Sequence, residues 1–216
     1  MANGMVMFIT LEGIEGSGKT TQIPKIVSYL EERGHQCVVT REPGGTAVGE
    51  KIRAILLDPD HTHLDAVTEL LLYVADRAQH LKQIVRPAIE SGKTVICDRY
   101  FDATTVYQGY ARGLSLERID ALHRMVLGNL KPDLTLLLDL PVERGLSRAW
   151  KQIDNGMRTG RETRFEEEAL AFHQRVRNGY LQIARQEPSR FGVVDASGSV
   201  EDVFRQITTQ LRIACK

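Results

Sequence analysis

The sequence has few cysteines, no net charge and no long hydrophobic run, and each of these absences argues against a class of protein. Its three cysteines, Cys37, Cys97 and Cys215, match the spacing of no zinc or redox motif. Their odd number favours a reducing compartment, and Cys37 and Cys97 lie in apolar runs typical of buried thiols. Lysine plus arginine and aspartate plus glutamate both total 28. This balance gives no general reason to expect a nucleic-acid or membrane partner.

No segment is predicted to direct the chain to a membrane. The apolar run 5–9 is too short for a secretory signal and is followed by Glu12 and Glu15. No apolar stretch approaches the length of a bilayer span. We therefore expect a cytoplasmic protein. With 216 residues, 42% of them hydrophobic and 26% charged, we expect one domain, residues 1–216, with an ordinary core.

The stretch from Gly13 to Thr20 carries the strongest signal. It reads Gly-Ile-Glu-Gly-Ser-Gly-Lys-Thr and fills the phosphate-loop template. The apolar run 6–11 before it is typical of a buried strand, and residues 22–33 after it have a helical pattern that stops at Gly34. An ordinary glycine-rich turn is disfavoured because template and context agree.

This stretch is predicted to bind a nucleoside triphosphate. Its glycines let successive backbone N–H groups point at phosphate oxygens, and the helix that follows adds its positive dipole end. Lys19 is expected to contact the β and γ phosphates, and the Thr20 hydroxyl to ligate Mg²⁺. The predicted ATP-binding residues are Gly13, Ile14, Glu15, Gly16, Ser17, Gly18, Lys19 and Thr20.

Short apolar runs alternate with longer helical patterns. This alternation predicts an α/β fold with a five-stranded parallel sheet and helices on both faces, and the phosphate loop assigns it to the P-loop NTPase class. Ligands bind at the carboxyl ends of such strands. The predicted strands are Val6–Leu11, Gln36–Thr40, Thr94–Asp98, Leu134–Asp139 and Phe191–Asp195, each apolar on both sides of the pleat.

Two helices have further features. The helix predicted over 65–90 carries more apolar surface than one sheet contact needs, so either a second subunit or deep burial covers the excess. Thr62 and Asp65 resemble a capping box at its start. Ser199 and Asp202 form another before the last helix.

Two polar clusters follow predicted strands. The turn 40–46 holds Arg41 and Glu42 before Pro-Gly-Gly, and on its own it could equally be a solvated loop. In the second, Asp98 could hold a magnesium shell and Arg99 could clamp a phosphate, the alternative being a structural ion pair.

The stretch 144–164 is rich in basic residues and has two flexible glycine-containing points. A solvated charged face is the plain alternative. Its position after a strand instead favours an arginine-rich lid, about 142–164, that closes over a nucleotide. Its basic residues are Arg144, Arg148, Lys151, Arg158, Arg161 and Arg164.

The abundance of arginine bears on the phosphoryl acceptor. A hydroxyl acceptor needs a general base, whereas a phosphate monoester, with a second pKa of about 6, needs none. A phosphate acceptor instead needs positive charge around it, so that it and the anionic triphosphate can approach each other. Besides the lid, the chain offers Arg41, Arg53, Arg77 and Arg99, which favours a nucleoside monophosphate.

Together these motifs resemble the thymidylate kinase family over nearly the whole chain. The phosphate loop is shared by many families, but its combination with the Arg-Glu-Pro-Gly-Gly turn and the Asp-Arg-Tyr strand end is far more specific. The matching segments are 13–20, 41–46, 72–77, 98–100, 107–109, 132–134 and 164–166. The resemblance implies phosphorylation of dTMP to dTDP by Mg²⁺-ATP, in dTTP biosynthesis, by a homodimer.

The resemblance also implies roles in dTMP binding. Tyr73 would stack on thymine, and Arg77 and Gln108 would hydrogen-bond the base. Tyr107 would crowd the sugar 2′ position and Glu15 would contact the 3′-hydroxyl. The remaining implied dTMP-binding residues, grouped around the acceptor phosphate and the base, are Arg41, Glu42, Arg53, Arg99 and Thr104.

For catalysis, the resemblance implies Lys19, Asp98 and Arg99, with Thr20 and Asp98 at the metal. Some members carry a catalytic arginine inside the phosphate loop. This chain has Ser17 at that place, which resembles the bacterial-type arrangement, and Arg158 or Arg161 would supply the charge from the lid.

Two other functions stay open from the residues. A deoxynucleoside kinase would use a free 5′-hydroxyl, with Glu42 as the base. A nucleotide-dependent switch protein would hydrolyse ATP slowly, but the guanine-reading Asn-Lys-x-Asp motif of GTPases is missing.

Overall fold

The computed structural model describes residues 6–61, 63–155 and 163–214. Within them, five strands form one sheet in the order β2-β3-β1-β4-β5, and every pairing is parallel. The predicted class is therefore confirmed. The strands are β1 Phe8–Glu12, β2 Cys37–Arg41, β3 Thr94–Asp98, β4 Leu134–Asp139 and β5 Phe191–Asp195.

Strand order decides how deeply each strand is buried. The three central strands are buried almost throughout, but β2 and β5 lie at the edges and are partly exposed, with Val39 and Val193 at 50% and 45% exposure. The expectation that all five are covered on both sides was therefore wrong for these two. β1 and β2 also begin one or two residues later than predicted.

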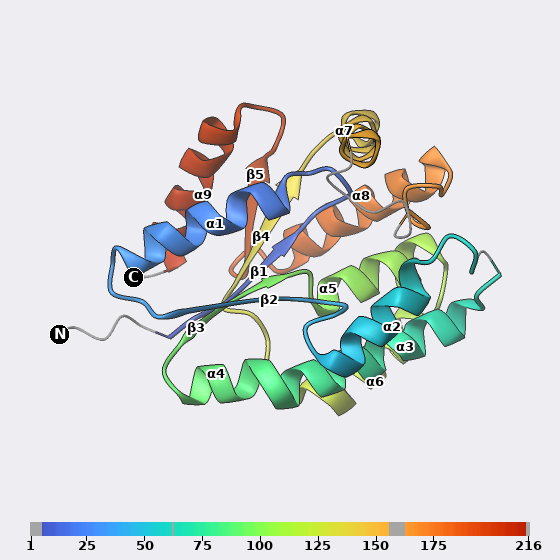
Figure 1. Ribbon diagram of the computed structural model, residues 1–216, viewed down its shortest axis with the longest axis horizontal. Helices are drawn as coiled ribbons and strands as arrows, with labels where there is room; N and C mark the ends of the chain where they lie inside the picture. Colours follow the sequence, from blue (N-terminus) through green and yellow to red (C-terminus); the bar gives the residue numbers. More distant parts are fainter. Residues whose placement is uncertain (1–5, 62, 156–162, 215–216) are drawn as a thin grey trace.

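Helices cover both faces of the sheet (Figure 1). On one face, Ile9 and Leu11 of β1 pack in a core shared with α1 and α9; on the other, Phe8 packs with Val85 and Val95 beside α4. The helices are α1 Lys19–Glu31, α2 Ala47–Leu57, α3 Ala66–His80, α4 Arg86–Glu90, α5 Phe101–Thr104, α6 Leu116–Leu127, α7 Val142–Asp154, α8 Leu170–Gln186 and α9 Val200–Ala214, with π-helical turns η1 Leu81–Val85 and η2 Thr105–Ala111.

The predicted helix over 65–90 is continuous but not uniform. Between α3 and α4 the turn η1 is π-helical and ends two residues before Pro87, which lacks an N–H group and crowds the preceding turn. Asp65 is the N-cap of the helix and accepts hydrogen bonds from the N–H groups of Val67 and Thr68. Thr62 lies outside the described residues, so its part in the predicted capping box stays a prediction.

The cap of the last helix is present. Ser199 Oγ accepts a hydrogen bond from the backbone N–H of Asp202 at 3.1 Å. Of the predicted buried thiols, Cys97 is buried and Cys37 only half-buried, because β2 is an edge strand; Cys215 lies outside the described residues.

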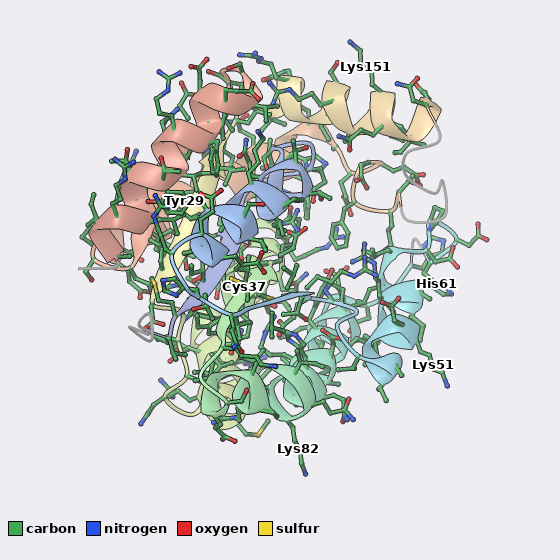
Figure 2. All side chains as sticks on the ribbon, turned by 60° about the vertical axis from the view of Figure 1, so that its left-hand side comes forward. Tyr29, Cys37, Lys51, His61, Lys82 and Lys151 are labelled. Atoms are coloured by element: carbon green, nitrogen blue, oxygen red, sulfur yellow. The ribbon has the colours of Figure 1, made fainter. Side chains whose placement is uncertain are left out.

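Several lysines lie at the surface of the molecule. Lys51, Lys82 and Lys151 project outward from different sides of the molecule (Figure 2). Within the described ranges, every helix is too short or too polar to traverse a lipid bilayer.

Candidate active site

The sheet register brings the predicted clusters to one edge. Leu11 of β1 and Arg41 of β2 both pair with Asp98 at the end of β3. The loop from β1 to α1 therefore starts beside the turn that follows β2 and the one that follows β3. Segments far apart in sequence meet here because parallel strands end at the same edge.

The phosphate loop has the backbone that its glycines allow. Gly13 and Gly16 have φ angles of +135° and +68°, a region that disfavours residues with a side chain. Lys19 bends back over the loop, and its Nζ donates to the carbonyl oxygens of Gly13 and Ile14, both at 3.1 Å. Burial, and then the neighbouring Arg99, lower the pKa of Lys19 to about 8.

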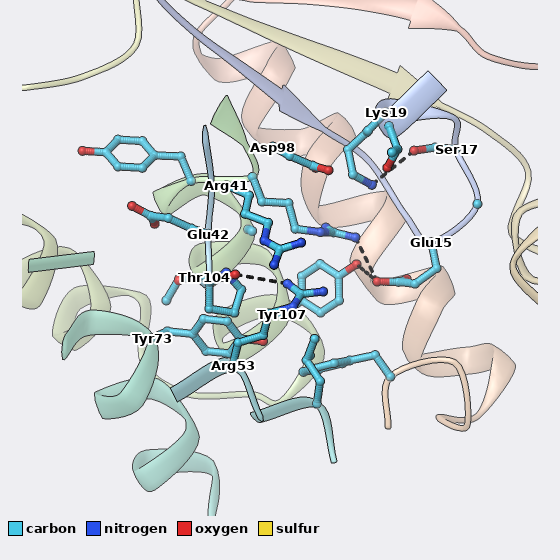
Figure 3. Close-up of a pocket in the computed structure, with 18 of the residues that line it drawn as sticks. Glu15, Ser17, Lys19, Arg41, Glu42, Arg53, Tyr73, Asp98, Thr104 and Tyr107 are labelled. Atoms are coloured by element: carbon cyan, nitrogen blue, oxygen red, sulfur yellow. Dashed lines mark hydrogen bonds and ion pairs between the residues drawn. The ribbon is translucent and has the colours of Figure 1, made fainter. Parts of the chain in front are cut away.

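A cavity of about 620 Å³ opens from this loop. In Figure 3, Lys19 and Asp98 lie toward the phosphate-loop end and Tyr73 toward the opposite end. The predicted residues that line the cavity are Glu15, Gly16, Ser17, Gly18, Lys19, Thr20, Arg41, Glu42, Arg53, Tyr73, Arg77, Asp98, Arg99, Thr104, Tyr107 and Gln108. Gly13 and Ile14 are buried and do not line it, and Arg158 and Arg161 lie outside the described residues.

Arg99 and Glu15 form the centre of the cavity wall. Arg99 Nη2 donates to Glu15 Oε1 at 2.9 Å, and the Tyr107 hydroxyl donates to the same oxygen at 2.6 Å. Burial acts to raise the pKa of Glu15, but Arg99, His173 and Lys19 together hold it well below its usual value. Arg99 itself has a positive φ of 67°, unusual for a residue with a side chain. Backbone strain of this kind clusters at functional sites.

A second ion pair lies in the wall of the same cavity. Arg77 Nε donates to Glu42 Oε2 at 2.7 Å, and His80 Nδ1 lies 2.7 Å from Glu42 Oε1. Arg77 Nη2 donates to Thr104 Oγ1 at 2.9 Å. Both oxygens of Glu42 are thus occupied within the protein, and this carboxylate holds Arg77 in place.

The donors present fit a magnesium ion. Asp98 Oδ1 is buried and has no hydrogen-bond partner among the described residues, and the Thr20 side chain lines the same cavity. Hard oxygen donors of this kind suit Mg²⁺, which kinase sites hold with one or two carboxylates and the substrate phosphates.

The basic stretch after β4 is placed differently from the prediction. Arg144 donates to the carbonyl oxygen of Ser197 and Arg148 to that of Ala196, so both tie α7 to the segment before α9. Arg164 is buried in an ion pair with Glu69. None of these three arginines, nor Lys151, lines the cavity. The arginine-rich lid stays a prediction, because in this structure backbone carbonyls and a buried carboxylate engage the three arginines.

Several residues of the site and its surroundings were not predicted. Gln152 of α7 and Glu166 line the cavity. His173 of α8 is fully buried with Nδ1 3.3 Å from Glu15 Oε2, and Tyr180 donates its hydroxyl proton to Glu12 at 2.6 Å. The sequence spacing of a polar residue on an apolar helix face does not identify its partner, so these contacts could not be predicted from the sequence.

Comparison with known proteins agrees with this geometry. The family model described as thymidylate kinase matches residues 11–207. The thymidylate kinase of Desulfosudis oleivorans is 58% identical over 205 residues, covering 95% of this chain and 96% of that protein. That of Geobacter sulfurreducens is 52% identical over 197 residues, covering 91% and 92%.

A solved structure is similar throughout. The crystal structure of thymidylate kinase from Ehrlichia chaffeensis has a TM-score of 0.74 and 34% identity, and the match covers 96% of this chain and 99% of that one. The chain therefore belongs to the thymidylate kinase family, as the family model, these relatives and the shared fold all show.

Proposed function

We propose that this protein transfers the γ-phosphoryl group of ATP to dTMP, forming dTDP and ADP in the synthesis of dTTP. One observation carries the proposal beyond family membership. The phosphate loop and three arginines, Arg41, Arg53 and Arg99, line the same cavity. A triphosphate and a second anion can therefore be held facing each other in one site, as in-line transfer requires.

The acceptor is a phosphate rather than a hydroxyl. A phosphate monoester is largely a dianion at neutral pH and attacks without a general base. Glu42, the candidate base of a deoxynucleoside kinase, has both oxygens engaged by Arg77 and His80. Its place in this buried cluster supports a positioning role for Glu42.

At the donor end, Lys19 would move from the loop carbonyls to the β and γ phosphates. Thr20 and Asp98 would hold Mg²⁺, which neutralises phosphate charge when bound. Either Arg158 or Arg161 would approach the transferred group from the lid. Ser17 inside the phosphate loop supports this assignment, because the loop itself offers no arginine.

At the acceptor end, Arg41, Arg53 and Arg99 would hold the dTMP phosphate. Tyr73 would stack on the base, and Arg77, Gln108 and Thr104 would lie at its edge. Tyr107 would sit against the sugar 2′ carbon, and Glu15 near the 3′-hydroxyl. The hydrogen bond from Tyr107 to Glu15 supports this, since it holds the two side chains together on the cavity wall.

We also propose a cytoplasmic homodimer. Val67 and Leu71 of α3 are about half exposed in the single chain, at 49% and 50%. Apolar side chains at these positions would be covered by a second copy. Sedimentation equilibrium of the wild type against a Leu71→Glu variant tests this, with a monomeric wild type as the contrary result.

The activity is tested by ADP release with Mg²⁺-ATP and a panel of acceptors: dTMP, thymidine, other monophosphates and none. We expect turnover with dTMP, and its loss in Lys19→Ala. Rapid use of thymidine without use of dTMP would support a deoxynucleoside kinase. Strong ATP hydrolysis without any acceptor would support a switch ATPase.

A further inference from the structure

Glu69 of α3 is a buried carboxylate that lies behind the cavity wall. It has no exposed surface, and it accepts hydrogen bonds from three side chains. Gln108 Nε2 donates to Oε1 at 2.7 Å, Arg164 Nη2 donates to Oε2 at 2.6 Å, and Arg112 Nε donates to Oε1 at 3.3 Å. Glu69 itself does not line the cavity, whereas Gln108 does.

This arrangement determines which way the Gln108 amide faces. A carboxylate held by two guanidinium groups can only accept hydrogen bonds, so it selects the NH₂ end of a neighbouring amide. Gln108 therefore turns its nitrogen to Glu69 and its oxygen, Oε1, away from it. No described residue donates a hydrogen bond to Oε1, on a side chain that shares the cavity wall with Tyr73 and Arg77.

We infer that Glu69 is a positioning residue that sets the pyrimidine specificity of this site, by presenting Gln108 to the base as an acceptor. The inference rests on the proposed function, because it takes the occupant of this pocket to be a pyrimidine monophosphate. Arg164 and Arg112 take part by holding the Glu69 carboxylate in place.

The chemistry of the bases determines which pyrimidine this site prefers. Thymine and uracil carry a hydrogen on ring nitrogen N3 and can donate it to Gln108 Oε1. The N3 of cytosine carries a lone pair, so two acceptors would face each other in a buried site. Sites that leave a buried polar group unpaired with the wrong substrate reject it strongly. A free amide could rotate and accommodate either base, but one held by Glu69 cannot.

The test compares kcat/KM for dUMP and dCMP, which differ at N3 and position 4 but share the unmethylated ring. In E69Q, the new amide can offer either its oxygen or its nitrogen to Gln108, so Gln108 is free to flip. We expect the preference for dUMP over dCMP to fall about tenfold, the factor that one net hydrogen bond supplies. In Q108A it should fall similarly, and E69Q/Q108A should show no further fall.

The matched control is E168Q. Glu168 pairs with Arg112 at 2.5 Å, whereas the hydrogen bond that Gln108 donates goes to Glu69. The variant thus weakens the same arginine cluster and should leave the preference unchanged. Equal losses in E168Q and E69Q, an unchanged preference in E69Q, or additive losses in the double variant would each overturn the inference.

If E69Q does not fold, E69D supplies the measurement. It keeps the negative charge for both arginines but shortens the reach to Gln108 by one methylene, so the preference should again fall. An unchanged preference in a folded E69D overturns the inference. The wild-type rate on dTMP is recorded alongside. Absence of that rate refutes the proposed function, whereas a normal rate with an unchanged preference in E69Q refutes only the role of Glu69.

Discussion

Gly16 of the phosphate loop and Gly145 of α7 pack backbone against backbone. A Cβ atom at Gly16 would overlap the Gly145 carbonyl, and one at Gly145 would lie 2.6 Å from the carbonyl oxygen of Glu15. Helix α7 is thus seated directly on the phosphate loop. The position of one constrains the other.

Gly145→Ala should therefore impair ATP use. The added methyl must displace either the loop or α7, and overpacking of this kind costs roughly 1–3 kcal/mol. We expect a raised KM for ATP and a lowered melting temperature. Ser147→Ala, at an exposed position of the same helix, is the control and should change neither. Wild-type kinetics in Gly145→Ala would show that the loop tolerates displacement.

The pKa of Lys19 predicts a proton linkage. In the free protein this pKa is lowered to about 8, so the ammonium group loses its proton as the pH rises past 8. Triphosphate binding favours the charged form and should raise the pKa again, so ATP binding at pH 8 takes up protons and weakens at higher pH. Calorimetry in two buffers of different ionisation enthalpy measures the uptake. Lys19→Arg should show none, and a wild type without uptake would contradict the assignment.

Arg99→Ala should mainly damage the use of dTMP. It removes a charge from the proposed acceptor end and leaves Glu15 without its guanidinium partner. Loss of one charge-assisted interaction costs about 1.5–3 kcal/mol, or roughly 10- to 150-fold in kcat/KM. Steady-state kinetics with dTMP measure it, with the exposed Arg185→Ala as control. Unchanged dTMP kinetics would refute the role given to Arg99.

Tyr73 should contribute through its ring rather than its hydroxyl. If it stacks on thymine, Tyr73→Ala should weaken dTMP binding by about 1–3 kcal/mol, whereas Tyr73→Phe should retain most of the affinity. Equilibrium titration with dTMP gives both values. Equal losses in the two variants would point to the hydroxyl instead.

His123 of α6 should make stability depend on pH. Burial, and then the nearby Arg77, lower its pKa to about 3 in the folded protein. The unfolded chain binds this proton near pH 6.5, so folding stability falls as the pH drops below that value. Between pH 7 and 5 the wild type should lose about 2 kcal/mol more than His123→Gln. Urea unfolding at both pH values checks this, and parallel losses would contradict it.

The strand–loop–helix unit around Lys19 was predictable because its determinants are local. An apolar run, three glycines and a lysine at set spacings leave few alternatives. The five strands were predictable for the same reason. The edge positions of β2 and β5 were not, because strand order arises from packing between distant segments.

Local patterns in the chain were enough to predict the sheet, the phosphate loop and most residues that line the cavity. The partners of those residues depend on how distant elements pack together. Gln108 and Arg164 donate hydrogen bonds to Glu69 from 39 and 95 positions away in the sequence. Gly145 of α7 packs against the phosphate loop. Spacing along the chain encodes helices, strands and turns, whereas a buried hydrogen bond depends on where two independent elements pack, which no local pattern records.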